Sequence, residues 1–96
     1  MTSSRFSIRQ QLPSAATRPN GVAARQGVVY LLDAYDLVEI DFDGVIVTPS
    51  FADELVGQLF ESLGEQTFRA RIKLVGVSPE VRPLLNHVIA KHRPRI

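Results

Sequence analysis

Apolar and polar residues alternate along three stretches of the chain, which is the period of a half-buried strand. The three stretches, each expected to form a strand, are residues 5–12, 38–42 and 71–77. The first predicted strand ends at Pro13, because proline cannot continue the pairing. The second runs into an Asp43-Gly44 turn, which the apolar run 45–47 follows.

Three other stretches repeat their apolar residues every three or four positions, which predicts amphipathic helices. The first helix is expected after the turn-forming residues 14–21, and the second over residues 51–63 with Gly64 as its C-terminal cap. The third is expected to begin at Ser78, a capping hydroxyl followed by proline, and Pro83 should kink it or delay its regular start. The apolar stripe of the second helix comprises Phe51, Ala52, Leu55, Val56, Leu59, Phe60 and Leu63.

Strands and helices therefore alternate along the chain. This order predicts an α/β fold, a small sandwich in which helices pack on a mostly parallel sheet of three to four strands joined by right-handed crossovers. With 96 residues, the chain is expected to form one domain over residues 1–96. Residues 91–96 are expected to be a frayed tail.

The net charge of +1 results from three blocks of opposite sign that sum as +4, −9 and +6. Arginines alone carry the first block, and the central block from Asp33 to Glu65 holds nine acidic residues without lysine or arginine. Two interpretations are open. The central block could form an acidic face that attracts a basic partner, or the blocks could meet in the fold and partly neutralise one another.

The composition excludes several classes of protein and site. Without cysteine there is no disulfide framework, no thiolate nucleophile and no cysteine-based metal site. No stretch approaches the roughly 20 apolar residues of a membrane span, and no apolar run resembles a signal peptide. We therefore expect a cytoplasmic protein that does not contact membranes.

One hydroxyl stands at the predicted start of the second helix. Ser50 is expected to cap this helix by accepting a hydrogen bond from the backbone N–H of Asp53. The partial positive charge of a helix start also favours a phosphate at the same place. The sequence thus allows a purely structural cap or a phosphorylatable switch at Ser50.

Several segments, in this order and spacing, together resemble the STAS superfamily of sulfate-transporter and anti-sigma-factor-antagonist domains. They are VEIDFDGV, the short approach that ends in Ser50, the acidic amphipathic helix and RIKLVGVSPEVRPLL. The segment SFADEL resembles the STAS-like branch described as a domain of unknown function. The resemblance is clearest over residues 38–90.

The resemblance implies a bacterial signalling module, an anti-sigma factor antagonist that works by partner switching. Such antagonists bind a GHKL-type ATP-binding kinase that acts as an anti-sigma factor and phosphorylates a serine, for which Ser50 is the matching position. Well-known antagonists read Asp-Ser-Ser-Gly where this chain has Thr48-Pro49-Ser50-Phe51. Gly57 joins the predicted partner surface because a missing side chain allows close approach. That surface comprises Thr48, Ser50, Asp53, Glu54 and Gly57.

Other functions have less support in the sequence. His87 and His92 lie five apart without an acidic neighbour and are expected to be solvated, so we predict no enzymatic activity, no catalytic residue, no cofactor and no metal. Nucleic-acid binding would need the basic ends to converge on one face. A third alternative is self-association through a sheet edge. The sequence leaves the partner, the oligomeric state and the role of residues 1–37 open.

Overall fold

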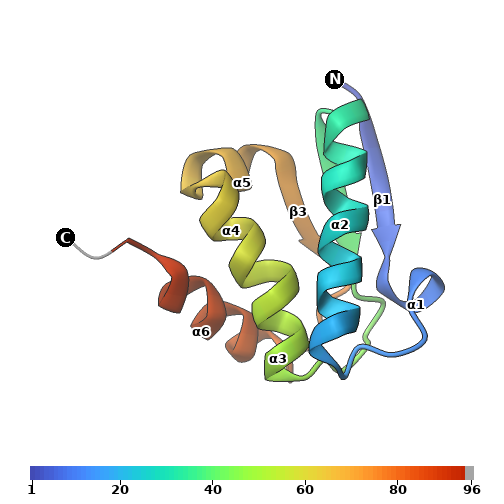
Figure 1. Ribbon diagram of the computed structural model, residues 1–96, viewed down its shortest axis with the longest axis vertical. Coiled ribbons are helices and arrows are strands. Elements are labelled where there is room, and N and C mark those ends of the chain that lie inside the picture. Colours follow the sequence, from blue (N-terminus) through green and yellow to red (C-terminus); the bar gives the residue numbers. More distant parts are fainter. Residues whose placement is uncertain (95–96) are drawn as a thin grey trace.

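The three strands of the sheet lie side by side in chain order, β1-β2-β3, and both pairs are parallel. The structure is a computed structural model that describes residues 1–94, and it confirms the expected α/β class. The helices that join successive strands lie on one face of the sheet (Figure 1). In chain order the elements are β1 (Ser3–Ser7), α1 (Ile8–Gln11), α2 (Arg18–Ala34), β2 (Leu37–Asp41), α3 (Pro49–Ala52), the π-helical segment η1 (Asp53–Gly57), α4 (Gln58–Leu63), α5 (Glu65–Arg71), β3 (Ile72–Val75) and α6 (Arg82–His92).

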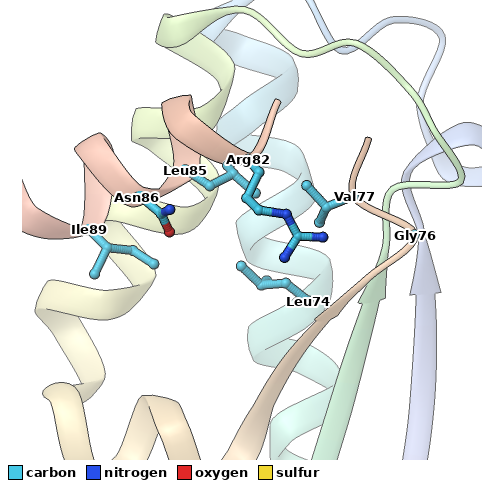
Figure 2. Close-up of a pocket in the computed structure, with 7 residues that line it drawn as sticks. All are labelled: Leu74, Gly76, Val77, Arg82, Leu85, Asn86 and Ile89. Atoms are coloured by element: carbon cyan, nitrogen blue, oxygen red, sulfur yellow. The ribbon is translucent and has the colours of Figure 1, made fainter. Parts of the chain in front are cut away.

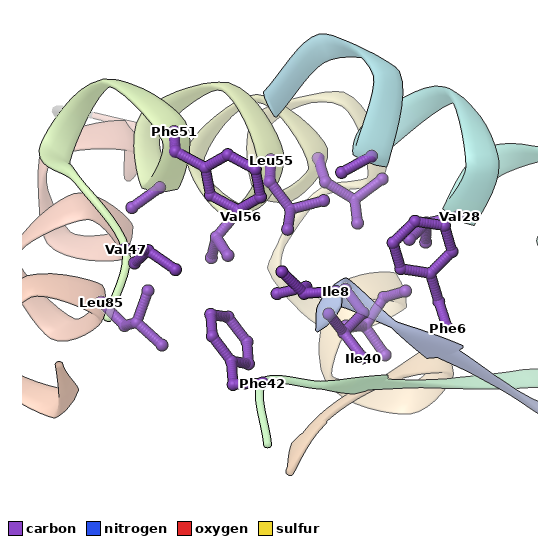
Figure 3. Close-up of a cluster of buried hydrophobic side chains, with 14 of the residues drawn as sticks. Phe6, Ile8, Val28, Ile40, Phe42, Val47, Phe51, Leu55, Val56 and Leu85 are labelled. Atoms are coloured by element: carbon purple, nitrogen blue, oxygen red, sulfur yellow. The ribbon is translucent and has the colours of Figure 1, made fainter. Parts of the chain in front are cut away.

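The core fills the space between the helices and the sheet. The predicted stripe of the second helix is confirmed, since all its residues are buried except Leu63, which is half-buried. Phe51, Leu55 and Val56 point from this helix toward Ile40 and Phe42 of the central strand region (Figure 3). The helix ends at Gly64, as predicted, with a positive φ of 82°. Other fully buried side chains are Ile8, Val28, Val38 and Leu59.

Among residues 1–94, no helix covers the second face of the sheet (Figure 1). Side chains alternate between the faces of a strand, so Arg5, Glu39 and Lys73 lie on this open face in register across the three strands. Arg5 contacts Glu39 at 3.2 Å and Asp41 at 3.6 Å. Parallel sheets are usually covered on both faces, and the charged residues explain why this face can stand in water.

The first half of the chain differs from the prediction at two helix starts. β1 ends at Ser7, whose hydroxyl accepts a hydrogen bond from the Gln10 N–H at 3.2 Å and begins α1. Residues 8–12 therefore do not continue the strand. α2 begins at Arg18 with Thr17 as its cap, so residues 18–21 belong to a helix rather than to a turn. Proline is tolerated there because the first helical turn needs no N–H from it.

Between the second helix and the last strand, the structure contains a helix that the sequence pattern did not predict. This helix, α5, buries only Phe68, too few apolar positions for a periodic signal. It ends at Arg71, whose guanidinium donates to the backbone carbonyls of Leu32 and Tyr35 at 2.7 and 2.8 Å. The predicted strand 71–77 is accordingly shortened to β3.

The last helix also begins later than its predicted cap. Ser78 does not cap α6, because the residue before the helix is Val81 and the buried Ser78 hydroxyl has no hydrogen-bond partner. Pro83 lies in the first turn of α6, which confirms the expected delay. The predicted fraying is wrong for Lys91 and His92, which are helical; residues 95–96 lie outside the described part. No helix among residues 1–94 combines the length and the apolarity needed to span a bilayer.

Candidate functional site

The helix that carries the predicted site begins with Thr48, not with Ser50. The Thr48 hydroxyl accepts a hydrogen bond from the Phe51 N–H at 3.3 Å and donates one to the Ala16 carbonyl at 3.0 Å. Pro49 then takes the first helical position, which its fixed φ suits. The predicted cap at Ser50 is therefore wrong, since Ser50 is the second helical residue and is half-buried. Its hydroxyl is not needed to start the helix.

Alanine substitutions distinguish the contributions of the Thr48 and Ser50 hydroxyls to stability. Thr48→Ala should lower the free energy of unfolding by about 1 kcal/mol, because it leaves a first-turn N–H without its acceptor. Ser50→Ala should change it by no more than a few tenths. Urea denaturation of both variants measures the difference. A larger loss for Ser50→Ala would show that Ser50 is the cap after all.

A π-helical turn interrupts the same helix at Asp53–Gly57. The Gln58 N–H bonds to the carbonyl of Asp53, five residues back, so one extra residue is accommodated and the polar face is rotated. Gly57 is buried, and a Cβ there would lie 2.5 Å from the His92 ring and 2.9 Å from Val88. The prediction that Gly57 lies exposed for a partner is wrong. The surface that approaches it is α6 of the same chain.

The Glu54 carboxylate is held by two arginines of α2. It accepts from Arg18 at 2.6 Å and from Arg25 at 3.0 Å, and Arg25 also donates to the Glu54 carbonyl at 3.0 Å. Gly21 lies between the two arginines, and a Cβ on it would lie 2.8 Å from the Glu54 Cβ and 2.9 Å from the Phe51 carbonyl. The missing side chain of Gly21 thus permits the close approach of the two helices. The Glu54 side chain retains only 14% exposure.

His92 joins α6 to the same helix. Its Nε2 lies 2.7 Å from Asp53 and its Nδ1 lies 2.6 Å from Glu61, and its side chain is only 9% exposed. The hydrogen bond to Asp53, then that to Glu61, raises the pKa of His92 against the opposing effect of burial. The hydrogen bond from His92 lowers the pKa of Asp53. The prediction of a solvated histidine without acidic partners is wrong, because both carboxylates come from a distant part of the sequence.

The three charge blocks meet in the fold. Each arginine of the first block pairs with the acidic block: Arg5 with Glu39, Arg9 with Asp43, Arg18 with Asp53 and Glu54, and Arg25 with Glu54. From the third block, Lys91 and His92 approach Asp53, and Arg69 and Arg93 approach Glu65. This geometry favours the second interpretation of the charge pattern. Around Asp53 and Glu54, the chain's own cations cover much of the negative surface.

The predicted site residues therefore differ in their surroundings. Thr48 caps the helix, Asp53 and Glu54 are ion-paired, Gly57 is buried, and Ser50 is a half-buried residue on the same helix. Four further residues belong to this region without having been predicted from the sequence: Arg18, Gly21, Arg25 and His92. The first three recur at helical spacing, which was a signal in the sequence that they share one face. Among residues 1–94, no three histidine or acidic side chains are placed to hold a metal ion.

Comparison with known proteins identifies the family. The family model described as the STAS-like domain of unknown function (DUF4325) matches residues 28–82. The matched region begins within α2 and ends at the first residue of α6, so it includes β2, the helix with Ser50 and β3. No curated protein and no solved structure matches the chain. The match spans more than half of the chain, which therefore belongs to the family of STAS-like domains.

Proposed function

We propose that this chain is a non-enzymatic binding module that works as an anti-sigma-factor antagonist does, and that phosphorylation of Ser50 switches its partner. The partner would be a protein, a GHKL-type ATP-binding kinase or another anti-sigma factor. Membership in the STAS-like family supports a binding role. The observation that carries the switch is that Ser50, at the start of the helix after the central strand, is a half-buried residue that does not cap the helix.

The charges beside Ser50 give the switch a physical mechanism. Asp53 and Glu54 lie three and four residues after Ser50, so they neighbour it on the helix surface. Arg18 contacts both carboxylates and is 51% exposed. A phosphate adds about −1.5 to −2 charges and would compete with these carboxylates for Arg18, because charge-assisted hydrogen bonds to phosphate are strong. The phosphorylated surface would be more negative, and Arg18 would pair with the phosphate instead of the carboxylates. Both changes would alter the affinity for a partner that binds this surface.

Calorimetry with a purified small GHKL-type ATPase from the same genome tests the proposal. Ser50→Asp should weaken its binding at least about tenfold, which corresponds to about 1.4 kcal/mol, and should leave the circular dichroism spectrum unchanged. Incubation with ATP should add phosphate to the wild type and not to Ser50→Ala.

Ser62→Asp is the matched control, because Ser62 is exposed on the same helix, at its far end. This variant should bind like the wild type. Equal affinities for the wild type and Ser50→Asp would refute the switch.

The alternative of nucleic-acid binding receives no support from a specific observation. It required the basic ends to form one face, whereas the basic residues of the first block and several of the third contact carboxylates. The strand β1 and the helix α6, which stand at the two ends of the described residues, also lie apart from each other (Figure 1).

A further inference from the structure

A groove of about 250 Å³ lies between β3 and α6. Arg82 reaches from the start of α6 toward Leu74 and Val77, and Leu85 and Ile89 form the wall above (Figure 2). A second hollow of about 320 Å³ shares Asn86 and Ile89 with the groove and extends it toward Phe60 and Phe68. The groove and its extension run along one side of α6, and aliphatic and aromatic side chains line them together with Asn86, Arg69, Arg82 and Arg93.

The outer edge of β3 borders this groove and pairs with no strand of residues 1–94. β3 pairs only with β2, and the Val75 carbonyl accepts from the Phe42 N–H at 2.9 Å on that side. The N–H and C=O groups of successive residues alternate sides along a strand, so those of Ile72 and Leu74 face away from β2. The Ile72 N–H caps α5 by donating to the Phe68 carbonyl, which leaves the Ile72 carbonyl and both groups of Leu74 on the outer edge. An open edge of this kind can accept an additional strand through main-chain hydrogen bonds.

Two unpaired cations lie beside this edge. In the part of the chain that the structure describes, every other lysine and arginine contacts a carboxylate or a backbone carbonyl. Lys73 and Arg82 have neither contact there, and both are exposed. Lys73 projects on the open face of the sheet, opposite to its neighbour Leu74. Glu39 lies across from Lys73 in the register, but no carboxylate of residues 1–94 contacts either cation, so both are available to carboxylates of a partner.

We propose that the outer edge of β3 binds an extended segment of a partner protein in which apolar and acidic residues alternate. The apolar side chains would enter the groove beside Leu74, and the acidic ones would face Lys73 on the open sheet face. A carboxylate at one end would meet Arg82. A second copy of this chain fits this edge poorly, because two such edges would place the Lys73 residues and the Arg82 residues against one another.

A capped peptide of about seven residues, a usual strand length, that alternates glutamate with valine and isoleucine is the probe. In ¹H–¹⁵N spectra of the full chain, its titration should shift the amides of residues 72–77 and of the first turns of α6, with saturation. Arg82→Glu with Lys73→Glu should weaken binding about tenfold. A peptide with lysine in place of each glutamate should show the opposite preference and bind this double variant better than the wild type.

Arg9→Glu is the control for charge reversal, because Arg9 is exposed, pairs with Asp43 and does not line the groove. It should leave the affinity for the acidic peptide unchanged. Three results would each overturn the proposal: no saturable shifts at residues 72–77, equal binding of the acidic and basic peptides, or self-association that already protects the amide of Leu74. The peptide titration uses the unmodified chain and no kinase, so its result does not depend on phosphorylation of Ser50.

Discussion

Gly21→Val is expected to lower the free energy of unfolding by about 3 kcal/mol. A Cβ at this position would lie 2.9 Å from the backbone carbonyl of Phe51, and no side-chain rotation can relieve contact with a backbone atom. The helices α2 and α3 would have to separate. That separation would also lengthen the contacts of Glu54 with Arg18 and Arg25, so packing and ion pairing would be lost together.

Ala23→Val is the matched control in the same helix. Ala23 is exposed, so valine there costs only the difference in helix propensity, about half a kcal/mol. Chemical denaturation of both variants gives the comparison. Equal stability of Gly21→Val and Ala23→Val would mean that the helices are not in close contact at Gly21.

His92→Ala is expected to lower the free energy of unfolding by about 2 kcal/mol near pH 5.5, because it removes two charge-assisted hydrogen bonds from a covered site. Only the protonated ring donates from both nitrogens, to Asp53 and to Glu61. Lys91 and Arg18 also face Asp53 and keep its carboxylate partly paired in the variant. The loss of stability in His92→Ala therefore measures the contacts of the histidine rather than the cost of an unpaired Asp53.

The sign of the pH dependence follows from the two shifted pKa values. The pKa of His92 is raised in the folded state, so its contribution is complete below about pH 6.5, the ordinary value, and is lost as the pH rises through the folded pKa. The pKa of Asp53 is lowered, so its contribution is present above its ordinary value of about 3.9 and is lost as the pH falls through the folded pKa. The stabilisation is largest between these limits.

Denaturation of the wild type and His92→Ala at pH 5.5 and pH 9.5 tests the predicted pH dependence of the His92–Asp53 interaction. The difference in stability should shrink at the higher pH. His87→Ala is the control, because His87 is exposed on the same helix and should show little effect at either pH. The same difference at both values would mean that His92 acts through packing alone.

The local patterns predicted elements well where many residues contributed to the signal. The stripe over residues 51–63 repeats through four turns, and its burial is confirmed. Helix starts were predicted less well, because each depends on one hydroxyl. Thr48 and Ser50 could both cap this helix, and Pro49, which favours the first helical position, selects Thr48. The helix α5 has one buried residue, Phe68. A single buried position gives no apolar periodicity from which a helix could be predicted.

The candidate site depended more on contacts between distant segments. From the sequence, Ser50 was expected near the carboxylates of Asp53 and Glu54, because residues three and four apart are neighbours on any helix. The sequence could not show that Glu54 lies over Gly21 or that a π-helical turn directs Gly57 toward α6. Both contacts depend on how three helices pack against one another. The periodicity of apolar residues within one helix carries no information about that packing.

The sequence by itself determined the α/β class, the apolar stripe, the segregation of charge and the resemblance to the STAS-like family, since each is a property of neighbouring residues. Only the tertiary structure decided which charges remain available, because pairing depends on distances between residues more than 30 positions apart, as in Arg18 with Glu54 and His92 with Asp53. By the same pairing, Lys73 and Arg82 are left beside an open strand edge.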